Sequence, residues 1–402
     1  MSFQPPKGVS DIHLPESAVW RRVLVAWEEW SQRFGYPLIL SPVFEATDLF
    51  ERGVGDTTEV VTKQMYTFED KGGRSVTLRP EGTAGVVRAF LDSGSQGAWK
   101  AAYSGPMFRY ERPQKGRSRQ FYQVGVEYLD VESPLADVEV IELGYRFITA
   151  VGLDQLELRL NTLGDANCRP AYLDALREFF RDREDRLCSD SVSLIEQNPL
   201  RILDCKVCAD VVQGAPAMAD YLCDPCRHHH DAVRSGLDLL GISYVEDPAL
   251  VRGLDYYTRT AFEYIGVGLD AAQNAVGGGG RYDGLAESIG GRRAPGVGFA
   301  LGVDRIVLAL NATEEPALDI FVISETGPDQ VVSLVSEMRL LGFAVDYDLE
   351  GKSTKAQFKT AARTGAPTTI IYHGSDQDVS VRFEDERHEV PLQEVAKWLT
   401  DK

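Results

Sequence analysis

The segment GPMFRYERPQKGRSRQFYQVGVE, residues 105 to 127, concentrates positive charge in a chain of 402 residues whose formal net charge is −19. Like charges that crowd together repel each other unless an anion lies against them. The apolar, β-prone residues on both sides predict two strands joined in a hairpin that presents the cations. We therefore interpret this hairpin as a phosphate-binding site. Its cations are Arg109, Arg112, Lys115, Arg117 and Arg119.

The composition limits the number of domains and the class of protein to which the hairpin can belong. With 44% hydrophobic residues, the chain can bury one large core and a smaller second one, so two or three domains are expected. The N-terminal MSFQPPKGVSD has no apolar signal segment and charges interrupt every long apolar run, so we expect a cytoplasmic protein that does not enter a membrane. The acidic balance excludes indiscriminate coating of nucleic acid and restricts any such contact to a local basic site.

Six cysteines without a secretion signal are better interpreted as thiols or metal ligands than as disulfide partners. Four of them form two C-x-x-C pairs at nearly the spacing with which two such turns share one tetrahedral zinc ion. Equally, the adjoining APAMADYL and RHHHDAVRSGLDLLG look helical, so the thiols could be small apolar side chains of a helical hairpin. Both interpretations stay open, and no metal ligand is assigned. The residues concerned are Cys205, Cys208, Cys223 and Cys226, with at most one or two of His228, His229 and His230 as further ligands.

The periodicity of the remaining chain predicts its elements. Residues 15–35 have helical spacing, and residues 37–53, 75–91 and 295–310 each read as a strand running into a helix. Residues 251–267 alternate like a strand, whereas VGGGGRYDGL, 276 to 285, reads as a flexible turn. Residues 167–235 differ in charge and cysteine content from their neighbours, which indicates an insertion. The expected domains are a main domain of residues 1–166 and 236–312, an inserted domain of residues 167–235, and a C-terminal domain of residues 318–402 after a linker at 311–317.

The C-terminal domain alternates strands and helices, which predicts a small α/β fold. Four cations follow spacings of three and four and are expected along one side of its second helix. Such a row is commonly a solvated helix face. A second basic site on an acidic chain nevertheless favours contact with an RNA backbone. The four are Lys352, Lys355, Lys359 and Arg363.

Taken together, these segments resemble the histidyl-tRNA synthetase family of class II aminoacyl-tRNA synthetases, from PPKGVSD almost to the C-terminus. FGYPLILSPVFE resembles the first class-defining motif, which forms the dimer; the hairpin resembles the second motif and GVGFALGVDRI the third. LVRGLDYYTRTAFE, residues 250 to 263, resembles the segment peculiar to the histidine enzymes. The resemblance implies an α/β multidomain protein: an antiparallel catalytic sheet flanked by helices, an inserted helical domain and a C-terminal α/β anticodon-binding domain.

The resemblance also implies the reaction, in which ATP, with Mg²⁺, activates L-histidine as an adenylate before transfer to the histidine tRNA. Arg109 is expected at the α-phosphate and the carboxylate, Arg305 at the γ-phosphate, and Arg252 at the carboxylate and α-phosphate, where other class II enzymes use a metal ion. Guanidinium groups suit this role because they neutralise charge through a planar fork. By the same resemblance Glu111 is assigned to ATP.

Histidine recognition requires an anion for the ammonium group and polar partners for the imidazole. Here the resemblance assigns Glu127 as the main discriminator, together with Tyr256 and Tyr257. Neighbouring residues of a strand point to opposite faces, so one of the two tyrosines is expected to pack in the core. The remaining residues assigned to histidine are Glu81, Gly82, Thr83, Gln123 and Arg252.

Transfer of histidine brings the acceptor stem of the tRNA to the hairpin tip, to which the resemblance assigns Gln114, Arg117 and Arg119. A homodimer is expected from the first motif. Two departures from the family pattern stand out: Tyr122 replaces an expected histidine, and the stretch near residue 377 looks shortened. The alternative function is that of a histidine-binding regulatory subunit of ATP phosphoribosyltransferase, but such relatives lack the C-terminal domain and erode the histidine-specific segment.

Overall fold

The structure is a computed structural model of the chain that describes residues 3–55, 58–114, 116–266, 274–312, 318–374, 378–383 and 386–401. Lys115 of the predicted phosphate site, residues 313–317 of the expected linker and residues 375–377 of the shortened stretch lie outside the described residues. The contacts divide the chain into two compact units, residues 1–313 and 314–402. The boundaries predicted for the inserted segment remain a prediction.

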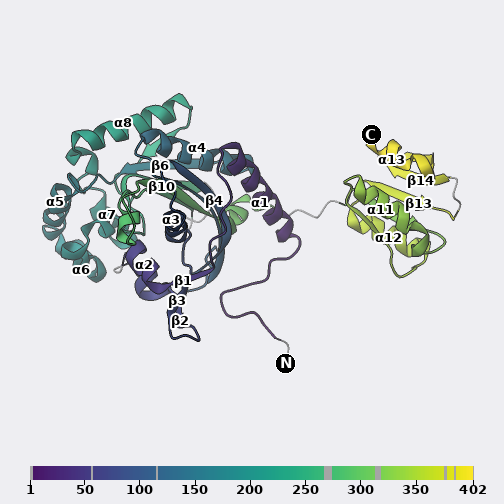
Figure 1. The fold of residues 1–402 in the computed structure, drawn as a ribbon, viewed down its shortest axis with the longest axis horizontal. Helices are drawn as coiled ribbons and strands as arrows, with labels where there is room; N and C mark the ends of the chain where they lie inside the picture. Colours follow the sequence, from purple (N-terminus) through teal and green to yellow (C-terminus); the bar gives the residue numbers. More distant parts are fainter. Residues whose placement is uncertain are drawn as a thin grey trace. The chain divides into compact units, whose positions relative to one another are not determined.

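A seven-stranded sheet in the order β4-β5-β10-β9-β8-β6-β7 forms the centre of the first unit (Figure 1). All neighbouring strands run antiparallel except β6 and β7, which are parallel. The predicted hairpin is confirmed, because Phe108 in β4 pairs with Gln120 in β5. The strands are β4 (Trp99–Phe108), β5 (Gln120–Leu129), β6 (Leu156–Thr162), β7 (Tyr244–Glu246), β8 (Thr258–Gly266), β9 (Ala275–Arg281) and β10 (Gly296–Gly302).

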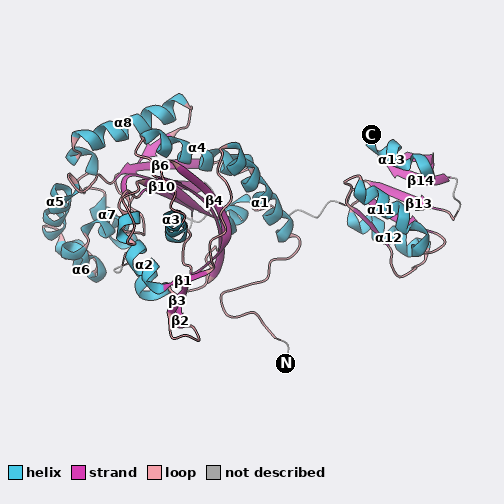
Figure 2. Cartoon of the chain, viewed as in Figure 1, coloured by secondary structure: helices cyan, strands magenta, loops and turns pink. Residues whose placement is uncertain are grey.

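Helices cover this sheet, as Figure 2 shows. The largest hydrophobic core joins α1 and α4 to the sheet, with Trp27, Phe147 and Phe299 in edge-to-face contact. A small antiparallel sheet in the order β1-β3-β2 precedes the helix α3. The remaining elements of this part are α1 (Glu16–Arg33), β1 (Phe44–Ala46), α2 (Thr47–Val54), β2 (Tyr66–Glu69), β3 (Ser75–Leu78), α3 (Thr83–Asp92), α4 (Pro134–Ala150), α9 (Leu285–Ser288) and α10 (Val303–Leu310).

The glycine run corrects one prediction. Instead of a flexible turn, residues 275–281 form β9, a central strand between β8 and β10. A Cβ atom on Gly279 would lie 2.0 Å from the carbonyl oxygen of Gly298, and one on Gly278 would lie 2.4 Å from that of Phe262. The strands therefore approach more closely than any side chain would allow, and the glycines serve packing rather than flexibility.

Residues between β6 and β7 form a helical subregion with a hydrophobic core of its own, which includes Tyr172, Leu176, Phe180 and Ile202. The helix predicted at APAMADYL is reduced to a 3₁₀ turn at Met218–Tyr221, whereas the following helix is confirmed. The α-helices are α5 (Arg169–Arg181), α6 (Ser189–Gln197), α7 (Ala209–Val212) and α8 (Asp224–Leu239).

The second unit is a five-stranded sheet in the order β12-β11-β13-β14-β15, parallel across β12, β11 and β13 and antiparallel beyond. Its own hydrophobic core confirms the predicted α/β fold, although β15 was not anticipated. The elements are β11 (Ile320–Ser324), α11 (Val332–Leu340), β12 (Val345–Tyr347), α12 (Thr354–Thr364), β13 (Thr368–Tyr372), β14 (Asp378–Phe383), β15 (Glu386–Pro391) and α13 (Val395–Thr400). In the part of the chain that the structure describes, no helix is at once long and apolar enough to span a bilayer.

Candidate active site

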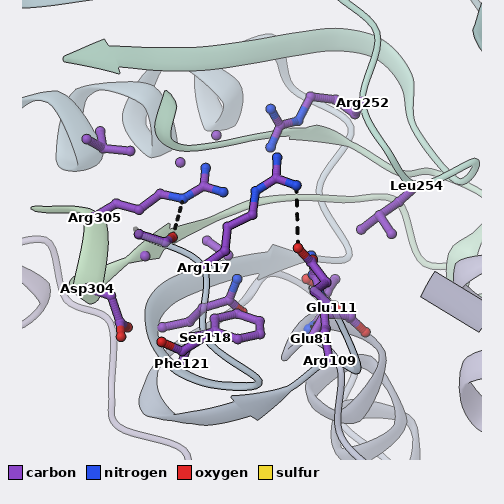
Figure 3. Close-up of a pocket in the computed structure, with 18 of the residues that line it drawn as sticks. Glu81, Arg109, Glu111, Arg117, Ser118, Phe121, Arg252, Leu254, Asp304 and Arg305 are labelled. Atoms are coloured by element: carbon purple, nitrogen blue, oxygen red, sulfur yellow. Dashed lines mark hydrogen bonds and ion pairs between the residues drawn. The ribbon is translucent and has the colours of Figure 1, made fainter. Parts of the chain in front are cut away.

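The structure brings the three predicted arginines to one cavity of about 180 Å³ on the sheet. Arg109 follows β4, Arg305 belongs to α10 and Arg252 lies before β8, so residues far apart in sequence meet there. Figure 3 shows Arg117, Arg252 and Arg305 pointing toward the same space. A cavity with four guanidinium groups in its lining is suited to an anion with several charges.

Backbone carbonyls hold two of these arginines in place. Nε of Arg109 donates to the carbonyl oxygen of Pro80 at 2.9 Å, and Nη1 of Arg305 donates to that of Ala275 at 2.7 Å. Burial lowers the pKa of both guanidinium groups, and the neighbouring cations Arg117 and Arg109 lower that of Arg305 further. An incoming polyanion would relieve this repulsion.

Arg252 is positioned by an acidic residue that the sequence analysis missed. Its guanidinium group forms a close ion pair with Glu263 on β8, while its Nε has no hydrogen-bond partner among the described residues. Burial alone would lower the pKa of Arg252, but the carboxylate of Glu263 outweighs it and the pKa is raised. The only sequence signal for this partner was its place in the histidine-specific segment, on the strand that follows Arg252.

Glu127 lies on β5 with no exposed surface. Its carboxylate accepts a close hydrogen bond from the hydroxyl of Tyr282, while Oε1 has no partner within the described residues. Burial raises the pKa of Glu127 to about 8. Opposite it on β10, a Cβ atom on Gly298 would lie 1.8 Å from Oε2, so this glycine makes room for the carboxylate.

Glu81 and Gly82 lie at the start of the helix α3, and Glu81 also lines the cavity. Glu81 accepts hydrogen bonds from the backbone N–H groups of Thr83 at 2.6 Å and Ala84 at 2.9 Å, and burial raises its pKa. It therefore satisfies the free N–H groups of the first helical turn. Gly82 does not line the cavity; a Cβ atom there would lie 2.5 Å from the ring of Tyr103. Thr83 and Gln123 line the cavity.

Tyr256 and Tyr257 both line the cavity, and Tyr257, which is 7% exposed, also packs in a hydrophobic core, as expected for one of the two. They precede β8 and lie in a turn, so the alternation of a strand does not apply to them. Their rings lie 4.6 Å apart between centroids, and Tyr256 also packs edge-to-face on Tyr282. Glu127 itself is not among the residues that line the cavity; Tyr282, whose hydroxyl donates to Glu127, connects it to Tyr256.

Some residues of the hairpin loop between β4 and β5 line the cavity and others do not. Arg117 pairs with the carboxylate of Glu111 at 3.4 Å, and both residues line the cavity. The guanidinium group of Arg119 lies 3.8 Å from the ring centroid of Tyr110, and its backbone N–H donates to the carbonyl oxygen of Gly8 at 2.8 Å. Among these residues Gln114 is exposed at the tip.

Three of the four predicted cations of the C-terminal unit lie on α12, where Lys355, Lys359 and Arg363 are exposed four residues apart. Lys352 precedes the helix, contrary to the prediction, and its ammonium group lies 2.7 Å from the carboxylate of Glu350. The cation row on this helix is therefore shorter by one residue.

The two C-x-x-C pairs do not meet. Cys223 and Cys226 group with Asp165 and Cys168, whereas Cys205 and Cys208 group with Cys188. A single zinc ion shared by both pairs is therefore excluded by the fold. His229 lies 3.2 Å from the carboxylate of Asp137, which also pairs with the fully buried Arg281. The histidine is thus engaged away from the thiols.

An antiparallel sheet that carries arginines, buried carboxylates and tyrosines around one cavity fits a class II aminoacyl-tRNA synthetase. Comparison with known proteins agrees. Residues 8–306 match the family model described as histidyl-tRNA synthetase. The chain is 49% identical to a histidine–tRNA ligase of Desulforudis audaxviator over 94% of its length and 92% of that protein. It is 44% identical to the histidine–tRNA ligase of Geobacillus kaustophilus over 100% of this chain and 99% of that protein.

A solved structure agrees over the same extent. The apo histidyl-tRNA synthetase of S. aureus superimposes with a TM-score of 0.80 at 35% identity, covering 99% of both chains. The chain therefore belongs to the histidyl-tRNA synthetase family. The predicted fold class is confirmed.

Proposed function

We propose that this protein ligates L-histidine to its cognate tRNA through a histidyl-adenylate formed from ATP. The observation that carries this proposal is the convergence of Arg109, Arg252 and Arg305 on a cavity that Tyr256 and Tyr257 also line, with the buried Glu127 behind Tyr282. The first step joins a carboxylate to a phosphate, so negative charges must be held together and neutralised as they build.

The three arginines divide the anionic groups between them. Arg109 contacts the α-phosphate and the histidine carboxylate, with Arg252 on the other side, and Arg305 holds the γ-phosphate. Because carbonyl and carboxylate partners already orient the three side chains, little rearrangement is needed when ATP binds. Glu111, which lines the cavity with Arg117, contributes to ATP binding. ATP carries Mg²⁺, which binds phosphate oxygens directly and is held to a protein by one or two carboxylates; Glu111 would be a suitable ligand for it.

Histidine is selected by groups that a wrong side chain would leave unpaired. Oε1 of Glu127, which is buried and has no partner among the described residues, accepts an imidazole N–H, while Tyr256 and Tyr257 enclose the ring. Glu81, Thr83 and Gln123 receive the α-ammonium group, for which the buried, unpaired oxygen of Gln123 is available. A substrate without the ring nitrogens would leave Oε1 of Glu127 buried and unsatisfied.

The tRNA contacts the exposed tip of the hairpin at Gln114 and the cations of α12. Arg117 and Arg119 remain assigned to the acceptor stem, but their contacts with Glu111 and Tyr110 mean that substituting them would also disturb the cavity. Because its substrates include ATP and tRNA, we expect the protein to act in the cytoplasm. Leu38, Leu40 and Phe44, 65%, 78% and 55% exposed in the segment that resembles the dimer-forming motif, support a homodimer.

The regulatory-subunit alternative is disfavoured. Curated ligases match the chain over its full length, including the second unit, and the histidine-specific segment supplies Arg252, Tyr256 and Tyr257 to the cavity.

Histidine-dependent exchange of pyrophosphate into ATP, followed by charging of histidine tRNA, tests the proposal. The purified protein should catalyse both reactions. Glu127→Gln should lower kcat/KM for histidine in the exchange reaction by about 100-fold or more, since one buried partner of the imidazole is lost. Histidine binding without exchange by the wild type would favour the regulatory alternative instead.

A further inference from the structure

All six cysteines belong to two separate clusters in the helical subregion between β6 and β7. Site A comprises Asp165, Cys168, Cys223 and Cys226; site B comprises Cys188, Cys205 and Cys208. Within each site the ligand atoms lie within 4.8 Å of one another, and all six thiols are free. Each C-x-x-C pair is thus completed by a cysteine that is distant in sequence and that spacing alone did not single out.

The geometry of site A is close to that of a tetrahedral metal centre. Oδ1 of Asp165 lies 3.5 Å from Sγ of Cys168 and 3.8 Å from Sγ of Cys223. A zinc ion with Zn–S bonds of about 2.3 Å separates two sulfur ligands by about 3.8 Å at the corners of a tetrahedron. Small side-chain rotations would therefore bring the four atoms of site A onto one ion.

The surroundings of site A fit metal ligands better than apolar packing. Cys168 and Cys226 are 5% and 1% exposed, yet a carboxylate lies among the sulfurs. Cys168 precedes α5 and Cys223 precedes α8, so the positive ends of two helices face the cluster. The other oxygen of Asp165 is oriented by Asn167 at 3.3 Å and by Arg259 at 3.7 Å, as partners outside a metal's ligands commonly do.

The geometry of site B also fits a metal ion. The sulfurs of Cys188 and Cys205 lie 3.7 Å apart, close to the separation on a shared zinc ion. The backbone N–H of Cys188 donates to Sγ of Cys208 at 3.2 Å, and Ser191 Oγ lies 3.2 Å from Sγ of Cys188. Cys188 and Cys205 are partly exposed, so solvent can complete the coordination of an ion held by three thiolates.

We propose that the protein binds two Zn²⁺ ions, one at site A through three thiolates and a carboxylate, and one at site B through three thiolates. Thiolates select zinc over the hard cations Mg²⁺ and Ca²⁺, which prefer oxygen ligands. The ion at site A joins the start of α5 to the start of α8. It also fixes the chain beside Arg169, whose guanidinium group donates to the carbonyl oxygen of Tyr257 at 2.7 Å, and so stiffens a segment next to the cavity.

Metal analysis of the full-length protein, purified without chelator or histidine tag, tests this proposal. The wild type should contain two zinc ions per chain. Cys226→Ser should lose the ion of site A and retain the other, whereas Cys208→Ser should lose only the ion of site B. As a matched control, His228→Ala changes an exposed side chain in the same helix as Cys226 and should retain both.

Any other result of the metal analysis contradicts one or both of the proposed sites. A wild type without zinc overturns both sites. A single ion lost in both cysteine variants contradicts two separate sites. A single ion lost only in Cys226→Ser removes site B, and one lost only in Cys208→Ser removes site A.

Two measurements on the wild type test the proposal even if the cysteine variants fail to fold. An organomercurial that reacts with thiols should release two equivalents of zinc, detected with a metal-binding dye. Protein loaded with Co²⁺ should show thiolate-to-cobalt charge-transfer bands and the strong visible absorption of tetrahedral cobalt. Six thiols that react without releasing metal, and no cobalt spectrum, would contradict the proposal.

Discussion

Glu127 illustrates how one buried residue links stability to recognition. It lies on β5, its Oε1 has no partner in the part of the chain that the structure describes, and burial raises its pKa to about 8, against an ordinary value of about 4.3. Between these two pH values the folded chain keeps a proton that the unfolded chain has released. The free energy of unfolding should therefore fall as the pH rises through this range.

Glu127→Gln should remove that pH dependence, because an amide cannot lose the proton. Relative to the variant, the wild type should lose on the order of 3 kcal/mol of stability between pH 5 and pH 8. Denaturant unfolding of both proteins at several pH values measures this difference. The exposed Glu287 of α9 offers a matched control, and Glu287→Gln should follow the wild type. Parallel curves for wild type and Glu127→Gln would contradict the raised pKa.

At this scale the sequence resemblance named the residues but not their partners. Arg109, Arg252 and Arg305 could be named from motifs, yet the ion pair of Arg252 with Glu263 depends on how β8 lies beneath it. Tyr257 takes the core position expected for one of the two tyrosines, but the strand predicted from residue 251 begins only at Thr258.

Among the elements, the central strand β9 borders the cavity directly. Gly277 and Gly278 line it, and the glycine run packs against the carbonyl groups of β8 and β10. Gly278→Ala should destabilise the protein by about 1–3 kcal/mol and displace Arg252, because the new Cβ atom would lie 2.4 Å from the carbonyl oxygen of Phe262 and 3.0 Å from Nη1 of Arg252.

Thermal unfolding and pyrophosphate exchange measure the effect of Gly278→Ala. A methyl group added at Gly284, just beyond β9, would have no neighbouring atom within 4 Å, and the backbone conformation there is an ordinary one. Gly284→Ala should therefore leave both properties close to those of the wild type. Equal behaviour of the two variants would show that the strands can separate to admit a methyl group.

The helix α12 carries the second prediction at this scale. Removing Lys355, Lys359 and Arg363 together by substitution with alanine should raise KM for tRNA and weaken its salt dependence, because phosphate contacts release counterions. Pyrophosphate exchange should be unchanged. Charging assays at several salt concentrations provide the measurement, with Lys397→Ala on α13, also exposed, as the control. An unchanged KM would identify the row as a solvated face.

At the scale of the whole molecule, the exposed apolar residues before β1 predict self-association. Leu40→Asp should shift the protein from dimer toward monomer, since an aspartate would be buried in the proposed interface without a partner. Light scattering coupled to size-exclusion chromatography measures the mass. Leu239→Asp is the matched control, because Leu239 is 88% exposed at the end of α8. A monomeric wild type would contradict the prediction.

The sequence by itself determined the local elements and the family. Helical spacing in residues 15–35, the hairpin around the cations and the alternating C-terminal units all depend on near neighbours, and the structure confirms them. Only the tertiary structure decided which distant residues meet. It placed the glycine run in the centre of a sheet and assigned the two C-x-x-C pairs to different clusters with Cys168 and Cys188. Spacing along a chain specifies which side chains share a turn, whereas a site assembled from several elements depends on packing between strands and helices that no local pattern encodes.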